Sequence, residues 1–247
     1  MGIKTDNGFT IIEAMLFLAV AGALTIAVLA GSGVAINQQR YKDSVNSFKS
    51  LLQQQYSEAT NVVNDRDGTQ ACANAIVVSP PDPVTPQSRG TSDCMVMGRL
   101  VTIDASGKQV QTASVVGYRT SDAAEEAGDI AELQANYKLG TSALSRENVD
   151  IAWDAMVVKP HTTQAMPMTM LILRSPLSGS LMTYSTEGVT TDLLSIVTAA
   201  NASKTVNLCL NASSISLTGN RMAVQVMPYA TGQGSIQVPP EQDKLCD

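Results

Sequence analysis

The sequence is poor in the residues on which most active sites depend. It contains one histidine, His161, which lies beside Pro160 in a polar stretch, and it has no nucleophile elbow, zinc protease, P-loop or dinucleotide-binding motif. A lone histidine in that setting is best interpreted as a surface imidazole. The alternating Met166, Met168 and Met170 indicate core or strand-face residues more strongly than a copper site. We therefore expect no catalytic residue, no cofactor and no metal.

Charged residues are also scarce, at 15% of the 247 positions, and aromatic residues make up only 4%. The net charge is -6, so the chain lacks the excess of Lys and Arg with which nucleic-acid-binding proteins neutralise phosphates. We expect no nucleic-acid partner. The length allows one membrane-anchoring segment and one globular head, since domains usually hold ~100 to 200 residues.

Closely spaced cysteine pairs are missing. The four cysteines, Cys72, Cys94, Cys209 and Cys246, include no CxxC pair, so the spacing of a tetrahedral zinc site is not present. Their even number indicates disulfides and an oxidising compartment, with four buried free thiols as the alternative. Of the three possible connectivities we favour Cys72 with Cys94 and Cys209 with Cys246, because each pair closes a separate local loop.

Charge is almost absent from residues 9–36, where Glu13 is the only charged residue. This apolar run is long enough to cross a bilayer as a helix. A secretory signal peptide is one alternative, because small residues at 30–35 offer a cleavage site. The run is roughly twice as long as the usual core of such a signal and carries a carboxylate near its start, which favours a membrane span. An uncleaved ordinary anchor is the other alternative.

A carboxylate in the apolar run needs a partner, since it costs a few kcal/mol in a bilayer. If the peptide bond between Gly8 and Phe9 is cut, a new positive amine appears at Phe9, one helical turn before Glu13. The two opposite charges could then pair, within one molecule or between two, in a medium of low dielectric constant.

Residues 8–13, with the sequence GFTIIE and the apolar run that follows, resemble the prepilin peptidase motif of type IV pilins and type II secretion pseudopilins. In that family a membrane peptidase cleaves after the glycine and methylates the new N-terminal phenylalanine, and the glutamate helps to draw an incoming subunit to the filament end. The resemblance assigns these roles to Gly8, Phe9 and Glu13. It covers roughly the first sixty residues, and it implies as partners the prepilin peptidase, the pilus assembly platform, other pilin subunits and the inner membrane before assembly.

Proline is absent before Pro80, whereas many family members carry one in the hydrophobic half of the helix, where the filament form unwinds locally. Gly22, Gly31 and Gly33 could replace it, because glycine lowers helix stability by about 0.8 to 1.0 kcal/mol relative to alanine. They could equally be routine small residues at which membrane helices approach closely. The basic residues do not support a cytoplasmic leader, because Lys4 precedes the span whereas Arg40, Lys42 and Lys49 follow it. A cytoplasmic leader is therefore inferred from the motif and from the cysteines.

Beyond residue 36 the pattern becomes amphipathic. Apolar residues recur at steps of three and four, which predicts one helical face that packs on the head, with a free coiled coil as the alternative. A continuous helix over residues 9–64 would be about 84 Å long at ~1.5 Å per residue. The residues of this face are Tyr41, Val45, Phe48, Leu52, Tyr56, Ala59 and Val63.

The remainder of the chain predicts a β-rich head. Residues 95–103 and 109–118 flank the turn sequence DASGK and predict a hairpin with glycine at a positive-φ position, and a helix is predicted from 121 or 122 to about 137. The proline-rich residues 79–86 indicate an exposed loop. Further strands are predicted at 155–159, 168–173, 181–185, 206–210 and 222–227.

The predicted fold is α+β and pilin-like: a long N-terminal helix, membrane-spanning in its first half and amphipathic in its second, packed on an antiparallel β-rich head. The expected parts are a leader at 1–8, an assembly half-helix at 9–36, an amphipathic half-helix at 37–65 and an extracellular head at 66–247. The predicted function is that of a noncatalytic filament subunit, a minor pilin or pseudopilin, stored in the cytoplasmic membrane. A monomeric anchored adhesin and an extracellular hydrolase that uses carboxylates are the alternatives.

Overall fold

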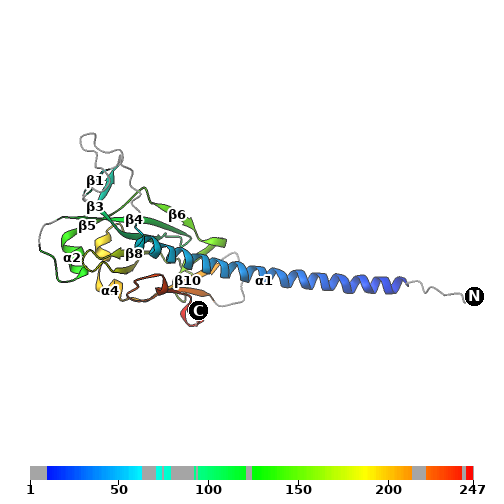
Figure 1. Ribbon diagram of the computed structural model, residues 1–247. Coiled ribbons are helices and arrows are strands. Elements are labelled where there is room, and N and C mark those ends of the chain that lie inside the picture. Colours follow the sequence, from blue (N-terminus) through cyan, green and yellow to red (C-terminus); the bar gives the residue numbers. More distant parts are fainter. Residues whose placement is uncertain are drawn as a thin grey trace, which may run out of the picture.

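The protein consists of one long helix whose second half packs on an elongated head of antiparallel strands (Figure 1). The α+β class and the β-rich head are as predicted. The computed structural model describes residues 10–62, 71–73, 75–78, 92, 94–120, 124–212, 221–240 and 243–246.

Helix α1 (Ile11–Thr60) is a single run of 50 residues, about 75 Å long at ~1.5 Å per residue. It begins at Thr10, whose hydroxyl accepts a hydrogen bond from the backbone N–H of Glu13 (3.3 Å), as expected of a threonine N-cap. It ends at Asn61, which leaves the helical conformation while its N–H still donates to the carbonyl of Ser57 (2.8 Å). The predicted end near residue 64 lies outside the described residues.

Two antiparallel sheets form the body of the head, and the larger one contains the hairpin predicted from residues 95–103 and 109–118. The larger sheet has the order β5-β4-β3-β8-β9, with β6 also paired to β4. The smaller has the order β12-β11-β10-β7. Their strands are β3 (Cys94–Ile103), β4 (Gln109–Arg119), β5 (Tyr137–Thr141), β6 (Glu147–Asp150), β7 (Ala155–Val158), β8 (Met168–Arg174), β9 (Leu181–Glu187), β10 (Val206–Ala212), β11 (Met222–Val226) and β12 (Ile236–Gln237).

The main core lies between α1 and the inner faces of both sheets. The predicted face of α1 is buried through Ala59. Successive residues of a strand point to opposite sides of the sheet, so Val101 and Ile103 of β3 join this core whereas Leu100 faces away. The methionines at 166, 168 and 170 are buried in the same core, which supports their interpretation as packing residues. Residues of α1 in the core are Tyr41, Val45, Phe48, Leu52, Tyr56 and Ala59.

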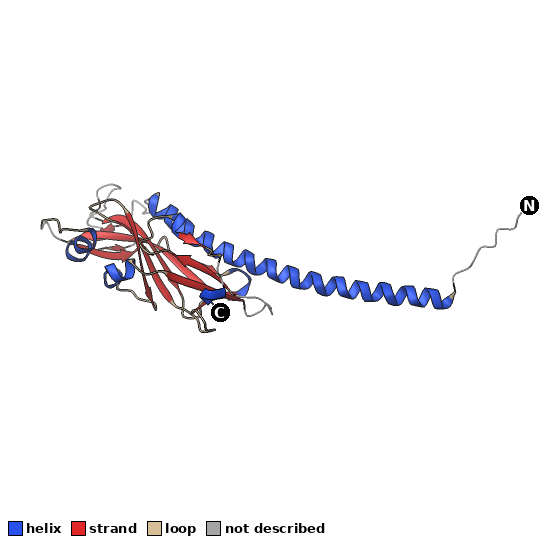
Figure 2. Cartoon of the chain, turned by 90° about the horizontal axis from the view of Figure 1, so that it is seen from below, coloured by secondary structure: helices blue, strands red, loops and turns tan. Residues whose placement is uncertain are grey.

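Short helices cover the other faces of the sheets, and Figure 2 shows α1 and these helices on different sides of the strands. A second core forms where α2, α3 and α4 pack on the outer face of the larger sheet, around Leu171, Leu173 and Tyr184. The smaller sheet carries α5 on its outer face. The remaining elements are α2 (Asp129–Asn136), α3 (Leu193–Ile196), α4 (Ala199–Ala202), α5 (Asp243–Cys246), the ribbon β1 (Ala71–Ala73) and β2 (Ile76–Val78), and the 3-10 turns η1 (Ala152–Asp154) and η2 (Gln233–Ser235).

The predicted helix over residues 121–137 begins too early, whereas its predicted end agrees with the structure to within one residue. Residues 124–128 are not helical, because Gly128 has φ +136°, which no helix can include, and α2 starts after it. The carboxylate of Glu132 also holds the preceding turn by accepting the backbone N–H of Glu126 (2.9 Å). At the other end Tyr137 is the first residue of β5, where pairing with β4 replaces the helix.

Candidate functional site: the exposed half of the long helix

The first half of α1 projects from the head with its apolar side chains exposed (Figures 1 and 2). Its most apolar window has a mean hydropathy of 2.4, and none of that window is buried. By length and composition this segment could cross a membrane. Exposed apolar surface on this scale marks a contact with lipid or with another protein. The large exposed side chains are Ile11, Ile12, Met15, Leu16, Phe17, Leu18, Val20, Leu24, Ile26, Val28, Leu29, Val34 and Ile36.

The hydroxyl groups within this half are satisfied by the helix itself. Thr25 donates to the carbonyl of Ala21 (2.8 Å), and Ser32 donates to the carbonyl of Leu29 (2.9 Å). Because these hydroxyl groups donate hydrogen bonds to carbonyls of the preceding turn, they do not depend on water for a partner. This allows a polar residue to lie in an apolar medium.

Glu13 lies in the first turn of α1 with its side chain exposed. A carboxylate near a helix N-terminus is favoured by the helix dipole. In the part of the chain that the structure describes, no salt bridge includes Glu13. The predicted cleavage site, Gly8 and Phe9, lies outside the described residues.

The three glycines of the apolar half leave the helix unbroken. A Cβ at Gly22, Gly31 or Gly33 would meet no atom within 4 Å, so none of these residues packs against the head. Their role, either local unwinding or close approach of a neighbouring helix, therefore stays a prediction about contacts outside this chain.

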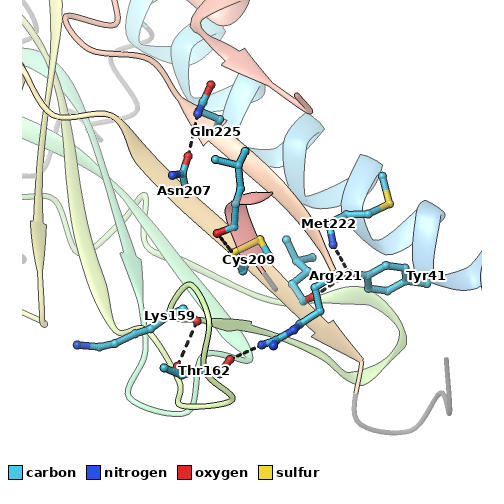
Figure 3. The surroundings of a disulfide bond; sticks show 11 residues. Tyr41, Lys159, Thr162, Asn207, Cys209, Arg221, Met222 and Gln225 are labelled. Carbon is cyan, nitrogen blue, oxygen red and sulfur yellow. Dashed lines mark hydrogen bonds between the residues drawn. A yellow bond between two sulfur atoms is a disulfide. The ribbon is translucent and has the colours of Figure 1, made fainter. Parts of the chain in front are cut away.

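Tyr41 marks the point at which α1 passes from exposed to buried (Figure 3). Its phenol oxygen donates to the carbonyl of Leu210 (2.7 Å) and accepts the backbone N–H of Met222 (2.6 Å). One side chain thus satisfies two backbone groups, one on β10 and one on β11. The helix is hydrogen-bonded to the smaller sheet at the first residue of its packed half.

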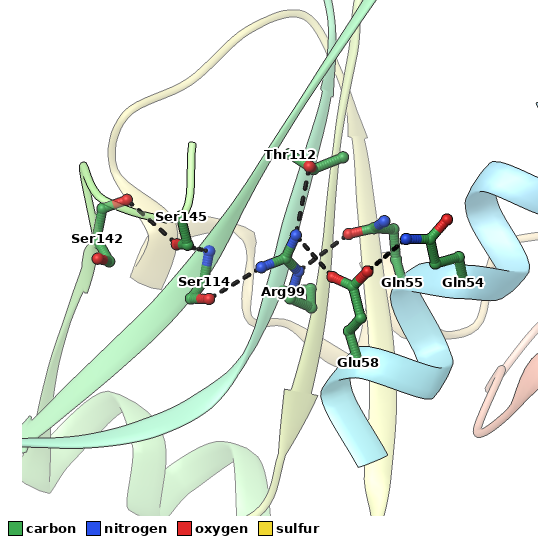
Figure 4. Close-up of polar contacts among 8 residues, drawn as sticks. All are labelled: Gln54, Gln55, Glu58, Arg99, Thr112, Ser114, Ser142 and Ser145. Carbon is green, nitrogen blue, oxygen red and sulfur yellow. Dashed lines mark hydrogen bonds and ion pairs between the residues drawn. The ribbon is translucent and has the colours of Figure 1, made fainter. Parts of the chain in front are cut away.

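Arg99 holds the far end of α1 to the larger sheet (Figure 4). Only 7% of this residue is exposed, and its guanidinium forms a salt bridge with Glu58 of α1 (Nη2 to Oε2, 2.8 Å). It also donates to Gln55 of α1 (3.0 Å), Ser114 (2.9 Å) and Thr112 (3.3 Å). A buried charge with this many partners is well satisfied and fixes the position of the helix on β3 and β4.

Both predicted disulfides are present. Cys72 is bonded to Cys94 at the start of β3, with their Cα atoms 5.9 Å apart. Cys209 of β10 is bonded to Cys246 of α5, with a Cα separation of 5.7 Å, and this bond attaches the C-terminal helix to the smaller sheet (Figure 3). No described cysteine is free.

Two acids of the head with lowered pKa, Asp129 and Glu132, have structural partners. Within the described residues no group of three or more His, Cys, Asp or Glu side chains could hold a metal, and the side chain of His161 is exposed as expected. Hydrogen bonds from Ser175 and Ser178 lower the pKa of Asp129 against the effect of its burial. The N–H of Glu126, assisted by other donors, lowers the pKa of Glu132. These shifts keep the carboxyl groups ionised, whereas general-acid catalysis needs the opposite direction.

A cavity of about 300 Å³ beside Arg99 is lined by two acids, Glu58 and Glu147. Glu58 is already paired with the Arg99 guanidinium. The geometry that a carboxylate hydrolase needs, a free pair of acids at the wall of a cleft, is therefore not formed in this cavity.

Comparison of the chain with models of protein families, with curated proteins and with solved structures found no match. The chain combines an apolar half-helix with a disulfide-bonded head, and the helix continues from one into the core of the other.

Proposed function

We propose that the chain is a structural subunit of a surface filament, held in the membrane and then in the filament by the apolar half of α1. The observation that carries the proposal is that one unbroken helix is exposed and apolar over residues 11–36 and buried in the head from Tyr41 onward. The thirteen large apolar side chains exposed there are worth on the order of 20 to 40 kcal/mol of burial. A protein gains that free energy only if lipid or other helices cover the segment.

The particular filament proposed is of the type IV pilin or pseudopilin class. The motif at residues 8–13 supports cleavage after Gly8 and methylation of Phe9, followed by pairing of the new amine with Glu13. Glu13 has no ionic partner among the described residues, so a second subunit can supply one. A charge pair between neighbouring subunits is strengthened in the low-dielectric interior of a filament, which favours assembly over storage in the membrane.

The proposed path runs from the cytoplasmic membrane, through the prepilin peptidase and the assembly platform, to a filament of stacked subunits. The head decorates its surface and serves attachment, motility or uptake. The size of the head favours a lower-copy subunit, a minor pilin or pseudopilin. No described site favours the alternatives of a monomeric adhesin or a hydrolase.

The first test is the N-terminal residue and mass of the mature protein recovered from cells. A methylated Phe9 start is expected. An intact Met1 would indicate an ordinary membrane-anchored protein, and a start near Ile36 would indicate a secreted domain. Either result contradicts the proposal.

The second test is Glu13→Ala, which is expected to leave correctly processed protein unassembled in the membrane. Asp43→Ala is the matched control, because Asp43 is an exposed carboxylate on the same helix beyond the apolar half. Filaments are measured by shearing and electron microscopy. Equal filament yield from the two variants would favour the monomeric adhesin.

A further inference from the structure

The only tryptophan of the chain lies at the end of the head from which the apolar half of α1 emerges. Trp153 is in η1, which contacts α1, and it is 49% exposed. Its ring packs against Arg40, with the guanidinium carbon 4.9 Å from the ring centroid. Arg40 immediately precedes Tyr41, where the helix enters the head. The Arg40–Trp153 pair thus marks the boundary between the exposed half of α1 and the head.

The backbone at this position is held in an unfavourable conformation. Trp153 has φ 61° and ψ 33°, and Asp154 has φ 55°, both in the left-handed region that a bulky side chain rarely adopts. Such conformations persist where the surrounding structure imposes them, and they gather at functional positions. Here the strain does not bury the indole ring, which stays half exposed.

The β3–β4 hairpin imposes this conformation. The side chain of Lys108 forms a salt bridge with Asp154 (2.6 Å), and the carbonyl of Lys108 accepts the N–H of Ile151 (2.8 Å). Gly107, at φ +72°, accepts the N–H of Val157 (2.7 Å) and approaches so closely that a Cβ would lie 2.4 Å from the carbonyl oxygen of Val157. Contacts with Gly107 and Lys108 therefore hold the chain on both sides of Trp153, at Ile151 before it and at Asp154 and Val157 after it.

The distance along α1 from Glu13 to the Arg40–Trp153 pair matches the thickness of a bilayer. From Glu13 to Arg40 the helix rises about 40 Å at ~1.5 Å per residue, and a bilayer with its headgroup layers is ~40–45 Å thick. With Glu13 at one face, Arg40 and Trp153 lie at the other. Indole rings concentrate at this interface because one edge is apolar and the N–H bonds to polar groups, and arginine places its charge among the headgroups.

We propose that Arg40 and Trp153 form an interfacial anchor that seats the base of the head in the lipid headgroup layer while the subunit is stored in the membrane. The proposal rests on membrane insertion of α1, as proposed above, and adds a contact between the head and lipid. The anchor fixes the height of the head above the bilayer and, through the rigid helix, the depth of Glu13.

Because the chain has one tryptophan, its own fluorescence tests the proposal. The full-length protein is reconstituted in vesicles of phosphatidylcholine and phosphatidylglycerol. Lipids that carry a spin label near the headgroup are expected to quench Trp153 roughly twofold more strongly than lipids labelled at the end of the acyl chain. Iodide in the aqueous phase is expected to quench it weakly.

The matched control is the double variant Trp153→Phe, Tyr229→Trp. Tyr229 is also an exposed aromatic residue (57%) at positive φ (51°). It lies next to Ala230, whose carbonyl accepts a hydrogen bond from Thr183, the partner of Tyr56. Tyr56 is about 24 Å further along α1 than Arg40. A tryptophan at 229 is expected to be quenched by iodide and not by either labelled lipid.

Three outcomes distinguish the interfacial anchor from membrane insertion of α1 alone. Strong quenching of Trp153 by the shallow label, with protection from iodide, supports the anchor. If the protein sediments with the vesicles but Trp153 behaves like the tryptophan at 229, the anchor is wrong and insertion of α1 stands. If the protein does not associate with vesicles at all, the proposed membrane segment fails and the anchor fails with it.

Discussion

The salt bridge between Glu58 and Arg99 makes a prediction whose size follows from the exposure of each partner. Glu58→Ala leaves the Arg99 guanidinium in place with its side chain 9% exposed and its counter-charge removed. Loss of one partner from a fully buried pair costs about 3–5 kcal/mol, and loss from an exposed pair costs about 0–1 kcal/mol. The Glu58 side chain is 35% exposed, and three hydrogen bonds to Arg99 survive, so about 2 kcal/mol is expected.

The assay is thermal unfolding of the full-length protein in detergent, followed by near-ultraviolet circular dichroism. A loss of about 2 kcal/mol lowers the Tm by roughly 4–8 °C in a protein of this size. The matched control is Glu187→Ala, which removes a glutamate from the exposed pair with Lys159 (2.9 Å) and is expected to change the Tm by less than about 2 °C.

A double variant completes the test. Glu58→Gln with Arg99→Met removes both charges, so it is expected to be more stable than Glu58→Ala alone. If Glu58→Ala and Glu187→Ala lower the Tm equally, the Arg99 guanidinium is solvated and does not fix α1 to the larger sheet.

Three further predictions concern the head. Tyr41→Phe leaves the carbonyl of Leu210 and the N–H of Met222 without this partner, and it is expected to cost about 1–3 kcal/mol, measured as a lower Tm with unchanged far-ultraviolet circular dichroism. Replacing Cys209 and Cys246 by serine opens a loop with a sequence separation of 37 and is expected to cost about 3–4 kcal/mol, and an unchanged Tm would show that α5 packs without the bond. The pKa of Glu132 is lowered from 4.5, chiefly by the backbone N–H of Glu126, so its contribution is present above about pH 4.5 and is lost as the pH falls through the folded pKa. The Tm of Glu132→Gln should therefore fall less steeply than that of the parent below that pH, and parallel curves would contradict this role.

The long helix and its packed face could be predicted because the signal is local and repeated. The six buried residues from Tyr41 to Ala59 are spaced three or four positions apart, and all six pack on the head. The hairpin of β3 and β4 could be predicted for the same reason, since alternation and a glycine at the turn coincide, and Gly107 has the expected positive φ. The disulfide pairs followed from sequence proximity alone.

Two strands and one polar network of the head could not be predicted, because they depend on residues distant in sequence. The segments YKLGT and ENVD have little strand character of their own, and they become β5 and β6 because the long strand β4 offers hydrogen bonds to both. The network around Arg99 joins residues on α1, β3 and β4. The sequence contains one indication of this network, since Arg99 is the only charged residue in the apolar strand predicted at 95–103. A charged residue in such a strand needs a partner.

The direction in which α1 lies on the head has a mechanical consequence. The packed half of the helix is bonded to the head near one end by Tyr41 and near the other by Glu58, with the buried face between them. Tension applied between the head and the projecting half therefore loads these contacts in shear along the helix axis, all at the same time. Contacts loaded together yield at a higher force than contacts that are peeled apart one after another, so α1 should resist being pulled along its axis out of the head more strongly than being peeled from one end.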